Sequence, residues 1–330
     1  MFFLLYHAKG KKQLRTCKYP RNVIDYQAVI FMNRQLKGSL TLLLATIIWG
    51  STFVAQSVGM DHIGPFTFQA VRCFLAVAGL VPVIAVTDRF KKDEKTFFAR
   101  WLDKKLWKTG LLCGIPLFFA CNLQQLAIVD TDAGKAGFLT AMYIVFVPIM
   151  GIFLGRKATK WIPLSVLLGA VGLYCLSCAG VTQVSTGDLL LLGCAVMFAL
   201  QIIFVDIFGD SLDSLRLNWI QSFVCAVLST VVMFFTETPD WQSVTACWFP
   251  LCYAGLLSMG AAYSLQIIGQ KFLPPTPASL IMSLESVFAV LFGCLILRET
   301  LTIWETLGCV LVFAAVILSQ LPDKKAAATK

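Results

Sequence analysis

Residues 136–157 read AGFLTAMYIVFVPIMGIFLGRK, and residues 278–300 read ASLIMSLESVFAVLFGCLILRET. Each stretch is a continuous apolar run of about 20 residues, the length that an α-helix needs to cross a bilayer. An offset of 142 positions aligns three pairs: Phe146 with Phe288, Arg156 with Arg298, and Tyr143 with Glu285. Because the two stretches share their length and their ending, they indicate an internal repeat of one membrane-spanning unit.

The composition of the whole chain points to lipid as its solvent. Of the 330 residues, 58% are hydrophobic and only 14% are charged, whereas a soluble protein carries roughly a quarter charged residues. The apolar runs are continuous, which indicates helices, because barrel strands are about 10-residue segments of alternating polarity. Ten apolar segments are predicted to span the membrane: 39–59, 64–86, 107–128, 133–155, 161–180, 187–207, 215–236, 246–269, 277–297 and 301–320.

The distribution of basic residues predicts the orientation of the chain. With the N-terminus in the cytoplasm, 24 of the 27 Lys and Arg residues fall in cytoplasmic segments and only Arg298 falls in an outer loop. This asymmetry is the positive-inside pattern. The other two, Arg72 and Lys135, lie within predicted helices. We therefore expect a multi-pass protein of the cell membrane with both termini in the cytoplasm, and the net charge of +9 becomes a topology signal with no nucleic-acid partner implied.

The repeat divides the chain into two halves, 38–180 and 187–320, of five helices each. Because five is odd, the second half must enter the membrane in the opposite orientation. The predicted fold is therefore an all-α integral membrane protein with ten transmembrane helices in two inverted five-helix repeats. Inverted repeats are typical of secondary transporters, which bind their substrate near the membrane midplane between the halves.

The ends of the chain lie outside the two repeats. Residues 1–37 form a basic extension expected in the cytoplasm, and residues 321–330 form a cytoplasmic tail. Met32 opens a stretch that would itself serve as a protein start. Residues 1–31 are therefore either part of the native protein or a dispensable extension.

Four motifs carry a resemblance to a known family. They are LLATIIWGSTFVAQ (43–56), QAVRCFLA (69–76) and the two stretches quoted above. Their types and order resemble the ten-helix EamA-domain carriers of the drug/metabolite transporter superfamily. One departure is Gly155-Arg156-Lys157, which lacks the acidic residue that the second copy keeps in Arg298-Glu299. The resemblance implies export or exchange of small metabolites, often amino acids or related amphiphiles.

Two charged residues within the predicted helices are candidates for function, because a charge inside a membrane costs roughly 3 kcal/mol on insertion scales. Glu285 lies near the middle of its segment. Its carboxyl either exchanges protons with a transport cycle or serves as a structural group hydrogen-bonded to a neighbouring helix. Arg72 either holds a substrate carboxylate or has a structural role, pairing with Glu285 or capping helix carbonyls.

Further polar and aromatic side chains occur within the apolar segments. They either bridge helices or line a water-filled cavity: Gln56, Asn122, Gln124, Gln125, Gln201, Tyr263 and Gln266. Trp49 and Tyr143 either pack or offer stacking faces to an amphiphilic substrate. Lys135 and Asp206 lie at helix ends, where they are either solvated groups or parts of an outer and an inner gate.

Several chemistries find no support in the sequence. It contains no phosphate-binding loop, no nucleophile elbow and no H-E-x-x-H motif. Its twelve cysteines lie mostly in apolar runs, and two histidines cannot complete a metal site at the usual spacings. We therefore expect neither an enzyme nor a cofactor or metal site.

The expected protein is thus a carrier of a small molecule in contact with membrane lipid, as a monomer or a homodimer, with a proton as the candidate coupling ion. Alternatives are a multidrug or nucleoside-type carrier of the same fold, a membrane-embedded lipid-modifying enzyme, and a non-transporting helper.

Overall fold

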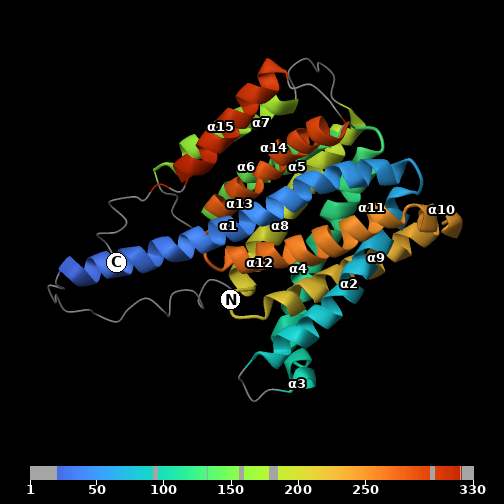
Figure 1. Ribbon diagram of the computed structural model, residues 1–330, viewed down its shortest axis with the longest axis horizontal. Coiled ribbons are helices and arrows are strands. Elements are labelled where there is room, and N and C mark those ends of the chain that lie inside the picture. Colours follow the sequence, from blue (N-terminus) through green and yellow to red (C-terminus); the bar gives the residue numbers. More distant parts are fainter. Residues whose placement is uncertain are drawn as a thin grey trace. The chain divides into compact units, whose positions relative to one another are not determined.

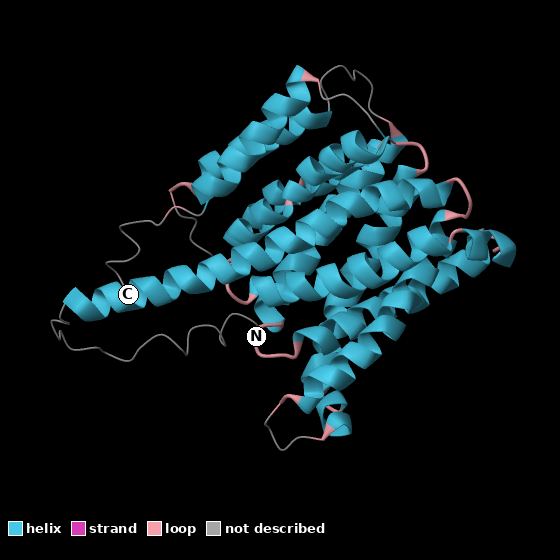
Figure 2. Ribbon diagram, in the orientation of Figure 1, coloured by secondary structure: helices cyan, strands magenta, loops and turns pink. Residues whose placement is uncertain are grey.

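A computed structural model describes residues 21–91, 96–131, 133–155, 160–177, 185–297, 302–319 and 321. The chain divides into two compact units, residues 1–36 and residues 37–330. The first contributes the beginning of α1 to the described residues, and the second contains all the other helices (Figure 1). Every regular element in the described part of the chain is helical (Figure 2). The ten predicted spans all fall within the second unit.

The helices follow the predicted apolar segments in order. They are α1 (Arg21–Met60), α2 (Pro65–Arg89), α4 (Lys104–Ile128), α5 (Ala133–Ala141), α6 (Tyr143–Phe153), α7 (Ile162–Ser177), α8 (Thr186–Phe208), α9 (Ser214–Thr236), α11 (Trp248–Cys252), η2 (Tyr253–Ala262), α12 (Tyr263–Gln270), α13 (Pro275–Met282), α14 (Leu284–Phe292), η3 (Gly293–Leu297) and α15 (Ile303–Ser319). Two short helices, α3 (Phe97–Trp101) and α10 (Trp241–Ala246), lie in connecting segments.

Eight helical stretches in the described residues are long and apolar enough to cross a membrane, and two shorter apolar helices lie in α7 and α15. Together they form a ten-helix membrane fold, as the apolar pattern predicts. Their outward surface suits lipid, since large apolar side chains such as Phe153, Phe235 and Ile303 are 86%, 84% and 77% exposed.

Small residues bring the helices close together. A Cβ on Gly172 of α7 would lie 2.8 Å from Leu311 Cβ and 2.9 Å from Val312 N of α15. This close approach explains why α7 and α15 form a tight pair, which Figure 1 shows side by side. Likewise, a Cβ on Gly50 of α1 would lie 2.8 Å from the backbone nitrogen of Ala289 of α14. Close backbone approach through small residues is the usual packing mode of helices in membranes.

Three predicted spans are not uniform α-helices. The span 133–155 breaks at Met142 between α5 and α6, and the span 277–297 breaks at Ser283 between α13 and α14. Neither break contains Gly or Pro, so the sequence pattern did not predict them. At the second break the Ser283 hydroxyl donates to the Leu280 carbonyl over 2.8 Å, a local bond that competes with the helical ladder. The third span, 246–269, contains the π-helix η2.

Candidate functional site

A cavity with about 480 Å³ of empty space, including the solvent at its opening, lies among helices of both halves. The residues that line it are Trp49, Thr52, Phe53, Gln56, Arg72, Gln124, Tyr143, Phe198, Gln201, Ile202, Ser258, Tyr263, Gln266, Met282 and Glu285. Among them Glu285 is the one carboxylate and Arg72 the one guanidinium. The cavity therefore presents one anionic and one cationic group in a largely apolar wall.

The two broken spans meet beside this cavity. Tyr143 is the first residue of α6, and Glu285 is the second residue of α14. The Tyr143 hydroxyl donates to Glu285 Oε1 over 2.9 Å. Next to this bond, the Ser286 hydroxyl donates to the carbonyl of Gly137 over 2.8 Å. Two hydrogen bonds thus join α14 of the second repeat to α6 and α5 of the first. Discontinuous helices of this kind form the binding sites of many carriers.

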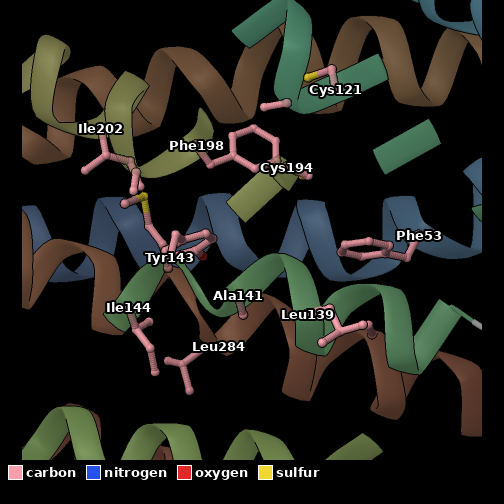
Figure 3. Packing of buried hydrophobic residues seen from close by; sticks show 14 of the residues in the cluster. Phe53, Cys121, Leu139, Ala141, Tyr143, Ile144, Cys194, Phe198, Ile202 and Leu284 are labelled. Atoms are coloured by element: carbon pink, nitrogen blue, oxygen red, sulfur yellow. The ribbon is translucent and has the colours of Figure 1, made fainter. Parts of the chain in front are cut away.

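Apolar side chains surround the Tyr143–Glu285 pair. Figure 3 shows Tyr143 with Ile144 and Leu284 to one side and Phe198 to the other. The Tyr143 and Phe198 rings pack edge to face with centroids 6.5 Å apart. Glu285 is only 6% exposed. A buried carboxyl group needs a hydrogen-bond partner, and the Tyr143 hydroxyl supplies it here.

Arg72 occupies the cavity wall contributed by the first half. One of its Nη atoms donates to Gln56 Oε1, and its guanidinium lies 5.8 Å from the centroid of the Phe68 ring. Its Nε–H has no hydrogen-bond partner in the described part of the chain. No ion pair joins Arg72 and Glu285, although both lie in described helices; Gln56 and Tyr143 are their partners instead. The guanidinium therefore retains donor capacity for a ligand.

Aromatic and amide groups complete the wall. Trp49 and Tyr263 pack edge to face with ring centroids 5.0 Å apart. The indole Nε1–H of Trp49 and the Oε1 of Gln266 have no partner among the described residues. Buried polar atoms normally have one, so these two, with Arg72 Nε, mark where a ligand or water would bind.

Not every predicted site residue reaches the cavity. Asn122 of α4 turns to the Phe118 carbonyl and the Ser229 hydroxyl, at 2.7 and 2.8 Å. Gln125 is fully buried outside the cavity, whereas its neighbour Gln124 lines it. Successive helix residues point about 100° apart, so the two glutamines cannot share one face.

The two gate candidates also lie outside the cavity. Lys135 forms an ion pair of 2.7 Å with Asp188, the residue whose carboxylate also caps the start of α8. Asp206 is half-buried near the other end of α8. The pair of Lys135 with Asp188 joins α5 of the first half to α8 of the second half.

A charged cluster that the sequence did not reveal lies where α2 ends and α9 begins. The buried Arg216 donates to Asp88 over 3.0 Å and to Asp213 over 3.1 Å. Arg100 pairs with Asp88 at 2.7 Å. Burial raises the pKa of Asp213, but the hydrogen bonds from Lys91 and from the Arg216 N–H outweigh it, so that pKa lies below its ordinary value.

At the opposite end of this helix pair, Glu237 accepts bonds from the backbone N–H groups of Phe66 and Thr67, at 2.9 and 2.8 Å. A carboxylate suits the positive end of a helix. Helices α2 and α9, one from each half, are therefore bound together at both ends.

The fold and the cavity define a polytopic membrane protein with a cavity between its two repeats. The EamA-like transporter family matches residues 36–178 and 185–321. A relative from Archaeoglobus fulgidus, "Uncharacterized transporter", is 31% identical over 289 residues and covers 87% of each chain. A Bacillus subtilis protein, "Uncharacterized transporter YoaV", is 25% identical and covers 86% of this chain and 97% of its own.

Among solved structures, one crystal structure has a TM-score of 0.69 at 18% identity, covering 86% of this chain and 96% of the other. At that identity it supports the fold alone. The chain belongs to the EamA-like transporter family, as its sequence motifs indicate. It is therefore a membrane transporter of the drug/metabolite type.

Proposed function

We propose that the chain is a secondary carrier that exports or exchanges a small zwitterionic metabolite, an amino acid or a related amphiphile, across the cell membrane by alternating access. The observation that carries this proposal is the cavity in which Arg72 of the first repeat and Glu285 of the second are the two charged groups. A ligand with one charge of each sign would contact both halves at once.

The free polar atoms suggest how such a ligand binds. Arg72 Nε and Trp49 Nε1 are donors without partners in the described structure, so they suit a carboxylate. Glu285 and Gln266 Oε1 offer acceptors to an ammonium group. The Trp49–Tyr263 pair provides an apolar and cation-binding face between them.

The broken spans support a rocking mechanism. Inverted repeats exchange conformations around a fixed midplane site, and discontinuous helices at the site allow each half to bend there. Glu285 is the candidate coupling residue, because a carboxyl group that is neutral in the empty cavity avoids the cost of an uncompensated charge within the membrane during the conformational change. Protonation of Glu285 would then alternate with substrate binding.

The proposed orientation places the exposed residues Lys104 and Asp240 on opposite sides of the cell membrane, Lys104 with both termini in the cytoplasm. Substituting each with cysteine and labelling intact cells with an impermeant maleimide tests this, relative to labelling of the native cysteines. Extra label on Asp240→Cys alone is expected. Extra label on Lys104→Cys would reverse the orientation.

The substrate class is tested by a thermal-shift screen of the purified protein against amino acids, nucleosides and cationic drugs. Stabilisation by amino acids alone is expected, and stabilisation by nucleosides or cationic drugs would favour those carriers instead. If no class stabilises the protein, the proposed function loses its main support.

Coupling is tested in proteoliposomes by uptake of the stabilising ligand with and without a pH gradient. Glu285→Gln is expected to abolish the response to the gradient. Glu237→Gln, which alters an acid outside the cavity in the same way, is expected to keep it. A normal response in Glu285→Gln would exclude Glu285 as the coupling residue.

A further inference from the structure

The helix segment η2, Tyr253–Ala262, contributes Ser258 to the lining of the cavity and has π-helical hydrogen bonding. The N–H that follows it, from Tyr263, donates to the carbonyl of Ser258, five residues back. Such a register leaves carbonyls near its end without the usual α-helical partner. In a buried setting those carbonyls need another donor.

Asn218 of α9 supplies that donor. It is fully buried, and its Nδ2 lies 2.9 Å from three acceptors: the carbonyls of Met259 and Gly260 and the hydroxyl oxygen of Ser264. The Ser264 hydroxyl itself donates to the Gly260 carbonyl over 2.7 Å. The π-helical register is thus held from a neighbouring helix by one amide.

A chain of side-chain amides connects Asn218 to the cavity. Gln221 Nε2 donates to Asn218 Oδ1 over 2.9 Å, and Gln201 Nε2 donates to Gln221 Oε1 over 3.2 Å. Gln266 Nε2 then donates to Gln201 Oε1 over 2.9 Å. All donors run in one direction, so each amide fixes the orientation of the next. Gln266 Nε2 also donates to Gln270 Oε1 over 3.0 Å. Gln266 lines the cavity, and its Oε1 has no hydrogen-bond partner in the described part of the chain.

The register of η2 also sets the geometry of the cavity wall. Ser258 lies within η2 and Gln266 beyond it, and both line the cavity. A change of one residue in register would turn one against the other by roughly 100°. Moreover, a Cβ on Gly255 of η2 would lie only 2.8 Å from the backbone carbonyl oxygen of Arg72. A shift of η2 would therefore also displace the backbone of Arg72, whose side chain lines the cavity.

We propose that Asn218 is a positioning residue for transport. It holds η2 in its π-helical register and, through Gln221 and Gln201, orients Gln266 so that its Oε1 faces the substrate's N–H donor. The substrate part of this inference rests on the proposed function; the register part does not.

Hydrogen–deuterium exchange of the full-length protein in detergent tests the register. In Asn218→Leu, exchange in residues 253–270 is expected to rise on the order of tenfold, as for loss of a buried hydrogen bond, while residues 65–89 keep their protection. The matched control is Asn122→Leu, another buried amide that bonds a carbonyl and a serine. Its effect is expected to stay outside 253–270.

Gln221→Leu breaks the same chain of side-chain amides one residue further from η2. It replaces Asn218→Leu as the test variant if Asn218→Leu does not fold. A smaller rise in the same segment is expected from it. Unchanged exchange in 253–270, or an equal rise there in Asn122→Leu, would overturn the inference.

Binding of L-phenylalanine and of its N,N,N-trimethyl derivative, which has no N–H donor, tests the consequence for the substrate. The wild-type protein and Asn122→Leu are expected to prefer the primary ammonium on the order of tenfold, and Asn218→Leu is expected to lose that preference. A retained preference in Asn218→Leu would contradict the positioning role. Failure of the wild type to bind either compound would count against the amino-acid proposal, while the exchange experiment would still decide the role of Asn218.

Discussion

Tyr143 donates a 2.9 Å hydrogen bond to Glu285, and the two residues are separated by 142 positions, the offset that aligns the two repeats. Equivalent residues of two inverted copies can touch only near the pseudo-two-fold axis, because the symmetry operation exchanges their places. The carboxylate therefore lies on the axis between the halves. One copy retains an acid there and the other supplies the phenol that binds it.

The Tyr143–Glu285 bond is expected to couple the two residues energetically. Tyr143→Phe keeps the packing on Phe198 but removes the donor, and Glu285→Leu removes the acceptor, which glutamine would keep. A double-mutant cycle on thermal stability should give an interaction of about 1.5–3 kcal/mol, the range for a bond to a charged group. Additive effects within error would show that the bond contributes little.

Arg72→Lys is expected to weaken ligand binding while keeping the charge. Lysine has three donors on one nitrogen but lacks the planar fork, so it cannot bind a carboxylate in two parallel hydrogen bonds while also bonding Gln56. The affinity for an amino acid should fall on the order of tenfold, a loss of about 1.4 kcal/mol. The decarboxylated amine should bind both proteins equally when titrated by calorimetry. An equal loss for amine and amino acid would place the substrate carboxylate elsewhere.

Gly50→Ala is expected to destabilise the protein by about 1–3 kcal/mol, the usual cost of overpacking. The new methyl would press on Phe288 Cβ and lie 2.8 Å from the backbone nitrogen of Ala289. Gly193→Ala is the matched control, since its Cβ would meet only Leu123 Cδ1, at 3.5 Å. Thermal unfolding in detergent should lower the midpoint of Gly50→Ala alone.

Asp88→Asn is expected to cost about 3–5 kcal/mol, because it leaves the buried Arg216 without its main counter-charge. Adding Arg216→Gln should recover part of that loss in the same unfolding assay. Asp240→Asn, at an exposed helix cap, should leave the unfolding midpoint nearly unchanged, because asparagine caps helices about as well as aspartate. No recovery in the double variant would argue that Asp88 acts through Arg100 or Lys91 instead.

The lowered pKa of Asp213 predicts that the protein loses stability at acidic pH. Its pKa in the folded protein lies below the ordinary 3.8, so its contribution is fully present above that value and is lost as pH falls through the lower folded pKa. The midpoint temperature of thermal unfolding should therefore fall as the pH is lowered from about 5 to about 3. Asp213→Asn should drop less steeply over that range. An identical slope in the two proteins would remove Asp213 from the cause.

Much of the cavity could be predicted from residue type alone. Trp49, Gln56, Arg72, Tyr143 and Glu285 stood out because polar and aromatic groups in a membrane span need a reason, and all five line the cavity. Residue type could not show that Gln124 lines the cavity whereas Gln125 and Asn122 do not. That choice depends on how each helix is rotated about its axis, which packing decides.

For a related reason, the sequence pattern did not predict the helix breaks at Met142 and Ser283. Met142 and Ser283 lie within apolar runs and are neither Gly nor Pro. Besides the local bond of Ser283, the breaks lie near hydrogen bonds that exist only between packed helices, such as that of Ser286 with Gly137. The π-helix is similar, since its carbonyls are bound by Asn218 from another helix.

The sequence by itself determined that the chain is an integral membrane protein, that it crosses the bilayer ten times and that it consists of one unit repeated in opposite orientation. Those properties follow from the length of apolar runs and from an odd number of helices per repeat. Only the tertiary structure decided which side chains share the cavity, where the helices break, and that Tyr143 and Glu285 meet. The physical reason is that hydropathy depends on one segment at a time, whereas a hydrogen bond between repeats depends on the position of both.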